Sequence, residues 1–252
     1  MALVINLARR TDRLASMTAL NLPFDWERLG AVDGRTLSWD ALQGRIHADA
    51  IEEAKYAERQ AVPTICRQLR SFSPHLTLAA AGCGLSHRKA WEALLASPHE
   101  FALIMEDDLS RVAPRLEDKL KALLTAVLPG TWQICFLGFH ESSGRLLPAS
   151  SAPQVAAVPR GACITGLYAY LLTKAAAKAL LQPGAIFPLR TQVDVAVAMR
   201  PWPEHARFAI DPQAVLVQCP KSEEGACDTD VQTLGEPGER AHANVPPGWQ
   251  LL

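Results

Sequence analysis

The sequence predicts an α/β fold, in which helices flank a central β-sheet. Two apolar runs, at Ala2–Leu7 and Phe101–Met105, are typical of buried strands, and strand and helix patterns alternate along the chain. The 252 residues are 49% hydrophobic, enough for one sizeable core but cramped for two domains. We therefore expect a single domain over 1–252, with a core over 1–220 and a polar, flexible tail over 221–252.

The first half of the chain is expected to form strand, helix, strand and helix in turn. After the opening strand, Thr11 offers an N-cap for a helix, and a second strand is expected to end near Val32, before an Asp-Gly turn. A polar stretch with mixed helical signals continues to about Pro74. The helical pattern at Leu78–Ala96 stops at Ser97-Pro98, since proline cannot continue a helix.

The second half repeats the alternation with shorter elements. Leucines spaced for one helix face predict a helix between Leu116 and Val127, and Thr173 can cap a later helix. Strands are expected at Trp132–Leu137, Tyr168–Leu172, Phe208–Ile210 and Val215–Val217.

The charge balance and the cysteines limit which classes of protein the sequence can belong to. Lys and Arg total 25 against 26 Asp and Glu, which gives no electrostatic case for binding nucleic acid or an anionic membrane. The first residues lack the basic region of a signal peptide, and no stretch is long enough to span a bilayer. The six cysteines contain no CxxC pair. We expect a reduced, cytoplasmic protein with no transmembrane segment, compatible with peripheral membrane contact.

Three adjacent acids, Glu106, Asp107 and Asp108, end the second apolar run. Ligands of open α/β sheets bind beyond the carboxyl ends of the strands. Mg²⁺ and Mn²⁺ favour carboxylate oxygen and keep open positions for water and phosphate. The triplet therefore indicates a metal site, with an acidic start to the following helix as the alternative interpretation.

A cluster of cations separates the first strand from the first helix. It contains Arg9, Arg10 and Arg13, in a place suited to holding a pyrophosphate. The same residues also fit a solvated helix start with salt bridges, so both interpretations stay open.

A glycine-rich motif, Gly82–His87, lies within the long helix. Its glycines allow close backbone approach, and it places Cys83 and His87 on one helical face, as a thiol nucleophile and its base would require. No orienting group is evident in the sequence. We therefore expect His87 to pack or to form hydrogen bonds rather than to serve a cysteine enzyme.

Taken in order, seven motifs resemble glycosyltransferase family 25, the lipooligosaccharide and collagen galactosyltransferases. The likeness spans the chain to about Asp230. The motifs are VINLARRTDR, AVDG, GCGLSHRKAWEALL, FALIMEDDL, WQICFLG, TGLYAYLLTKAAAKALL and QVD.

The resemblance implies a GT-A type fold, with a Rossmann-like, mostly parallel sheet flanked by helices. It implies transfer of a hexose, most often galactose from UDP-galactose, to a glycan or other hydroxyl acceptor such as a lipooligosaccharide, with inversion and with Mn²⁺ or Mg²⁺. It also places Asp108 as the metal ligand beside Glu106 and Asp107, with the nucleotide close to Asn6, Arg10 and Arg13.

Transfer also needs a base that takes the acceptor's proton. We expect Asp194, an acid set among apolar residues, with a helix N-cap as the alternative role and Asp228 and Asp230 as the next candidates.

Two positions depart from the family pattern: Ala8 stands where an acid is common, and Cys227-Asp228 where Ser-Asp is expected. They leave open a catalytically silent module that binds a nucleotide sugar or a glycan. A glycoside hydrolase is disfavoured, because Glu106 and Asp108 are too close along one backbone to flank a bond.

Overall fold

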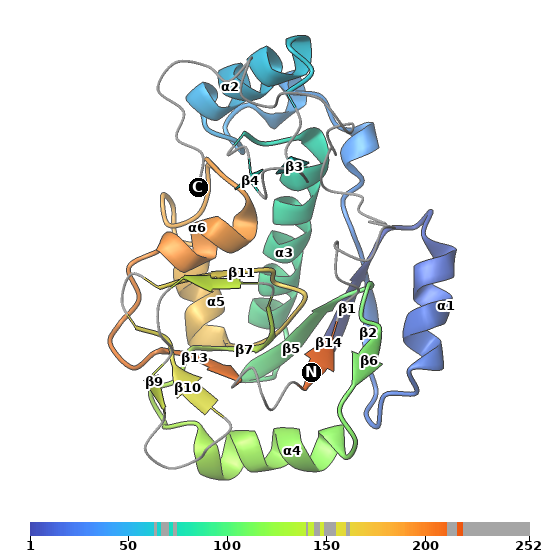
Figure 1. The fold of residues 1–252 in the computed structure, drawn as a ribbon, viewed down its shortest axis with the longest axis vertical. Helices are drawn as coiled ribbons and strands as arrows, with labels where there is room; N and C mark the ends of the chain where they lie inside the picture. The colour runs from blue at the N-terminus through green and yellow to red at the C-terminus, as the bar shows by residue number, and fades with distance from the viewer. Residues whose placement is uncertain are drawn as a thin grey trace.

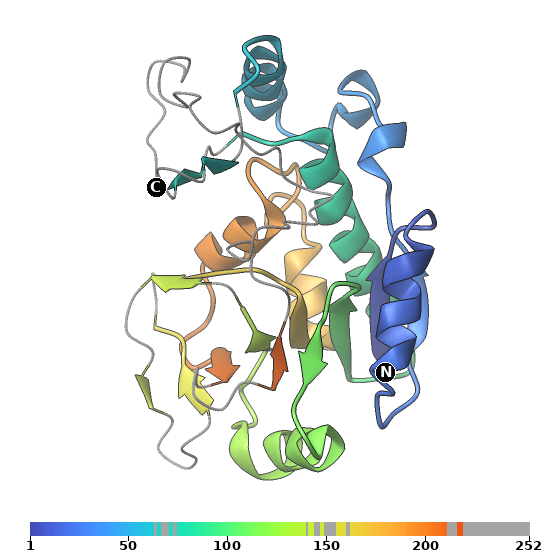
Figure 2. The same ribbon diagram turned by 45° about the vertical axis from the view of Figure 1, so that its right-hand side comes forward.

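The computed structural model contains an eight-stranded sheet with helices on both faces (Figures 1 and 2). The strand order is β2-β1-β5-β12-β7-β13-β10-β9. The strands are β1 (Ala2–Asn6), β2 (Glu27–Gly30), β5 (Phe101–Glu106), β7 (Ile134–Gly138), β9 (Leu147–Pro148), β10 (Val155–Ala157), β12 (Ala169–Thr173) and β13 (Arg207–Ile210). The structure describes residues 1–62, 65–66, 71–72, 75–139, 141–143, 147–148, 155–159, 162–210 and 216–218.

Six of these eight strands share one direction, and β12 and β10 run the opposite way. The predicted α/β fold with a mostly parallel sheet is therefore confirmed. Among the described residues, three smaller strand pairs are separate from the main sheet: β3 (Ile65–Cys66) with β4 (Ser71–Phe72), β6 (Arg111–Val112) with β14 (Val217–Gln218), and β8 (Glu141–Ser143) with β11 (Cys163–Thr165).

Helices cover both faces of the sheet because successive strand residues point to opposite sides. On one face, Leu3 and Ile104 belong to a core that includes α3, α5 and α6. On the other face, Val4 and Leu103 pack with residues of α1 and α4. Figure 1 places α2 and α4 at opposite ends of the molecule. The helices are α1 (Thr11–Ala19), α2 (Ala48–Arg59), α3 (Leu78–Ala96), α4 (Leu116–Ala122), α5 (Lys174–Leu180) and α6 (Val193–Met199).

Most predicted elements are present at nearly the expected bounds. The long helix spans Leu78–Ala96 as predicted, and the leucine-rich helix continues past α4 through a π-helical turn to Val127. The unassigned polar stretch contains α2. Thr173 caps α5 by accepting a hydrogen bond from the Ala176 N–H. None of the helices in the described ranges combines the length and apolarity needed to cross a bilayer.

The predicted N-cap at Thr11 is wrong. Thr11 is already the first residue of α1, because the carbonyl of Arg10 accepts from the Leu14 N–H at 3.1 Å and so starts the helix one residue earlier. Strand β2 also ends at Gly30, ahead of the expected Val32. The predicted strand at 215–217 overlaps β14, but Val215 and the tail over 221–252 lie outside the described residues, and the single-domain expectation stays a prediction.

Two glycines let α3 contact the loop after β2. A Cβ on Gly82 would lie 2.6 Å from the carbonyl oxygen of Val32, and one on Gly34 would lie 2.5 Å from the Ala79 Cα. Ser86 completes the contact by accepting from the Val32 N–H at 2.8 Å. The close approach expected at Gly82 is thus confirmed, and it fixes α3 against the loop that follows the edge strand β2.

We expect Gly82→Ala to destabilise the fold. Alanine is the better helix former by about 1 kcal/mol, but the clash with the Val32 carbonyl should outweigh this gain and leave a net loss of roughly 1–3 kcal/mol. Denaturant unfolding measures the difference. Gly130→Ala is the control, since a Cβ there meets nothing within 4 Å. Equal unfolding free energies for the two variants would contradict the contact.

Candidate functional site

The parallel pairing of β1 with β5 brings the carboxyl ends of both strands to one edge of the sheet. Ile5 pairs with Glu106, so Asn6 lies beside the acidic triplet. Asn6 Nδ2 donates to Asp107 Oδ2 at 2.6 Å, and Arg13 Nη1 donates to Asp107 Oδ1 at 3.0 Å. Arg28 Nε donates to Asn6 Oδ1 at 2.8 Å. Asp107 therefore links β1, α1 and the end of β5, and three of the predicted site residues, Asn6, Arg13 and Asp107, form one hydrogen-bonded network.

Asp108 differs from Asp107 in its surroundings. Its Oδ1 atom is buried and accepts no hydrogen bond from any residue that the structure describes. Desolvation, aided by the charge of Glu106 and opposed by that of Arg13, raises the pKa of Asp108 to about 7. A hard divalent cation binds carboxylate oxygens. A carboxylate oxygen that is buried from solvent, accepts no hydrogen bond from the described residues and lies close to a second acid is suited to bind such an ion. Asp108 and Glu106 thus fit the predicted metal.

Glu106 ends a chain of hydrogen bonds that begins on α3. His87 Nε2 lies 3.0 Å from Glu106 Oε1, and His87 Nδ1 lies 2.9 Å from the Tyr170 hydroxyl. Trp91 Nε1 donates to the same hydroxyl at 2.9 Å. Because the Glu106 carboxylate can only accept, we infer that a neutral His87 donates from Nε2 to Glu106, which leaves Nδ1 to accept from the Tyr170 hydroxyl. The expected hydrogen-bonding role of His87 is confirmed.

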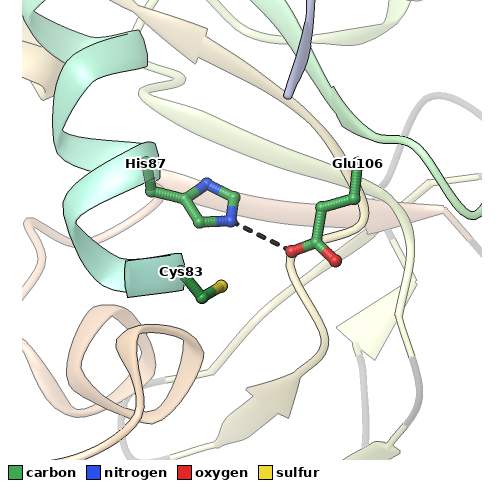
Figure 3. A group of neighbouring side chains, drawn as sticks. All are labelled: Cys83, His87 and Glu106. Carbon is green, nitrogen blue, oxygen red and sulfur yellow. Dashed lines mark hydrogen bonds and ion pairs between the residues drawn. The ribbon is translucent and has the colours of Figure 1, made fainter. Parts of the chain in front are cut away.

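Cys83 lies one helical turn before His87 and faces the same carboxylate (Figure 3). Burial raises the pKa of the Cys83 thiol well above its ordinary value, and the charges of Glu106, Asp194 and Asp108 raise it further. A thiol that resists ionisation is a poor nucleophile. The structure does supply the orienting groups that the sequence did not reveal, but the electrostatics argue against a cysteine enzyme.

Asp194 is the second residue of α6, and the N-cap position belongs to Gln192. The alternative interpretation, in which Asp194 is the N-cap of this helix, is therefore wrong. Its Oδ2 atom accepts from the Gly166 N–H and its Oδ1 atom from the Val195 N–H, both at 2.8 Å. Two backbone donors thus fix the carboxylate, whose charge acts on Cys83 together with those of Glu106 and Asp108.

The remaining cations form ion pairs at the start of α1. Arg10 Nη2 lies 2.7 Å from Asp12 Oδ2, and the hydrogen bonds from Arg10 lower the pKa of Asp12 to about 2. Arg9 Nε lies 2.9 Å from Asp33 Oδ2, in the loop that α3 contacts. These contacts fit the salt-bridged helix start, while a role in nucleotide binding stays a prediction. Asp228 and Asp230 lie outside the described residues.

Sequence reasoning missed three residues that support the site. Tyr170 and Trp91 orient His87, and Arg28 on the edge strand β2 holds Asn6. The tyrosine carried a usable signal, because a hydroxyl in an otherwise apolar buried strand needs a partner. Arg28 carried none, since an arginine in an exposed strand is ordinary.

These features define a class of protein: an open α/β sheet with carboxylates and cations beyond the ends of adjacent parallel strands, where such sheets bind ligands. Residues 1–139 match the profile of "Glycosyltransferase family 25 (LPS biosynthesis protein)". The match covers more than half of the 252 residues, and the chain belongs to glycosyltransferase family 25. The matched region contains the acidic triplet and ends before Asp194.

A relative from Aedes aegypti, named "Glycosyltransferase 25 family member", is 32% identical over 142 residues. The aligned region is 54% of this chain and 20% of the relative. The chain therefore spans about a fifth of that relative's length.

Proposed function

We propose that this protein transfers a hexose, galactose from UDP-galactose, to a hydroxyl of a glycan such as a lipooligosaccharide. One observation carries the proposal: in this member of glycosyltransferase family 25, a buried oxygen of Asp108 beside Glu106, at the carboxyl end of a central strand, has no hydrogen-bond partner among the residues that the structure describes. A departing diphosphate is an anion that must be neutralised where it leaves. The family description, which names LPS biosynthesis, supports the choice of acceptor.

Asp108 and Glu106 would hold the Mn²⁺ or Mg²⁺ ion. The bound ion supplies charge that stabilises the departing diphosphate. Asp107 acts indirectly, because its hydrogen bonds with Asn6 and Arg13 position the acids on either side of it. Arg10 and Arg13 flank the start of α1 and contribute positive charge for the nucleotide.

Asp194 is the proposed base. With inversion, the acceptor hydroxyl attacks the anomeric carbon from the face opposite the diphosphate, and its proton passes to a carboxylate on that side. The two backbone N–H groups that hold Asp194 support this role, because they keep its carboxylate in one orientation. The free thiols of Cys83 and Cys135 favour a reducing compartment, and we place the reaction in the cytoplasm.

A screen of nucleotide sugars with a lipooligosaccharide acceptor tests the proposal. Released nucleotide is measured with Mn²⁺ and with EDTA, and we expect UDP release from UDP-galactose only when the metal is present. A rise in melting temperature with UDP-galactose but no UDP release would instead indicate a silent binding module.

Arg10→Ala is expected to weaken UDP binding by roughly 1.5–3 kcal/mol, the range for a lost hydrogen bond to a charged group. Calorimetric titration with UDP measures the change. Arg115→Ala is the matched control, because Arg115 also pairs with an acid of its own helix start, Asp118, at 2.9 Å. An unchanged dissociation constant for Arg10→Ala would show that Arg10 does not bind the nucleotide and only forms the surface salt bridge at the start of α1.

A further inference from the structure

Three side chains of different chemistry converge between α3 and the end of β5 (Figure 3). The Cys83 sulfur, a ring nitrogen of His87 and a carboxylate oxygen of Glu106 all lie within 4.8 Å of one another. We propose that Cys83, His87 and Glu106 bind a divalent ion of borderline softness, such as Zn²⁺ or Co²⁺. This site overlaps the magnesium- or manganese-type site at Asp108, because both would use Glu106, but it differs from that site in its sulfur and nitrogen ligands.

The donor set selects this class of ion. Sulfur and imidazole are poor ligands for Mg²⁺, whereas Zn²⁺ accepts sulfur, nitrogen and carboxylate oxygen in one tetrahedral site. The helix supplies two of the ligands in fixed register, because Cys83 and His87 are four residues apart on one face of α3. Three protein ligands leave a fourth position for water or another molecule.

The surroundings of His87 resemble the support of a metal-bound histidine. The Tyr170 hydroxyl lies 2.9 Å from Nδ1, and Trp91 holds that hydroxyl in turn. With Nε2 on the ion, the imidazole proton would move to Nδ1, and the Tyr170 oxygen, which has two lone pairs, would accept from both His87 and Trp91. Such partners fix the ring and its tautomer and raise the affinity of the metal site.

The charge around the thiol also favours a cation. Glu106, Asp108 and Asp194 all act on Cys83 with negative charge. A divalent ion offsets this accumulation, and its binding displaces the thiol proton to solvent so that sulfur becomes a ligand. One consequence rests on the proposed function. Because an ion bound here withdraws Glu106 from the catalytic metal, we expect Zn²⁺ to inhibit sugar transfer.

Titration of the whole protein with Co²⁺ tests the site, because a thiolate bound to Co²⁺ gives a charge-transfer absorption that oxygen ligands do not give. We expect this absorption in the wild type and its loss in Cys83→Ala. Cys135→Ala is the matched control and should retain it, since Cys135 is buried in the core on the opposite face of the sheet. Circular dichroism of each metal-free variant verifies the fold.

Absence of the absorption in the wild type, or its survival in Cys83→Ala, would overturn the proposal.

A second measurement uses Tyr170→Phe, which keeps the ring and removes the hydroxyl. We expect its Zn²⁺ affinity, measured by competition with Co²⁺, to fall roughly 10- to 100-fold, as for other supporting partners of metal ligands. An unchanged affinity would contradict the supporting role of Tyr170. Neither readout requires sugar transfer, so failure of the proposed reaction would be distinguishable.

Discussion

Asp108→Asn is expected to abolish sugar transfer while the protein keeps its fold. The substitution removes a ligand of the ion that neutralises the diphosphate, an effect of several kcal/mol that lowers turnover on the order of 10³-fold or more. Stability should not fall, because the Asp108 carboxylate is desolvated and is repelled by Glu106, and its Oδ1 atom has no hydrogen-bond partner among the described residues. Turnover with UDP-galactose and Mn²⁺ and denaturant unfolding measure the two effects.

The control for this variant is Asp118→Asn, which removes an exposed acid in the first turn of α4. It should change neither turnover nor metal dependence. Full activity of Asp108→Asn, or of the wild-type protein after EDTA treatment, would refute the metal assignment at Asp108.

Asp194→Asn should lower the turnover number by roughly 10²- to 10⁴-fold, the range for loss of a positioned base, while the affinity for UDP stays nearly constant. Stability should also change. The carboxylate accepts two backbone hydrogen bonds, and an amide has only one oxygen with which to replace them. One partly buried N–H then loses its acceptor, and the free energy of unfolding should fall by roughly 1–3 kcal/mol.

Asp49→Asn separates these effects from a general helix-start effect. Asp49 is the second residue of α2, as Asp194 is of α6, and its side chain is exposed. The control should retain full turnover. If Asp194→Asn keeps more than about a tenth of wild-type turnover, a smaller loss than positioned bases usually cause, the base lies elsewhere in the chain.

The fold was predictable where the sequence pattern is both long and periodic. The bounds of α3 follow from its helical spacing and the Ser97-Pro98 stop, and β5 follows from a continuous apolar run. An apolar run carries no information about direction, so the antiparallel placement of β12 between β5 and β7 could not be predicted. The Thr11 cap failed because a cap depends on which carbonyl starts the helix, here that of Arg10.

The site was predictable as residue types at strand ends, but not as contacts. Adjacent acids after a buried strand pointed to Asp107 and Asp108 without distinguishing their roles. Only the fold shows that Asn6 and Arg13 engage both oxygens of Asp107, whereas one oxygen of Asp108 is buried without a described partner. Differences of this kind arise from long-range contacts, and local spacing cannot encode them.

The irregular pairing of β12 makes the length of one loop as important as the identity of any site residue. Tyr170 lies opposite Ile104 on one side and Phe136 on the other, with a shift in register next to Ala169. Because side chains alternate between faces, a slip of one residue would turn the Tyr170 hydroxyl away from His87 and toward α1 and α4. Inserting or deleting a single residue between Gly166 and Ala169 should therefore uncouple Glu106 from its support, although every residue of the site would still be present.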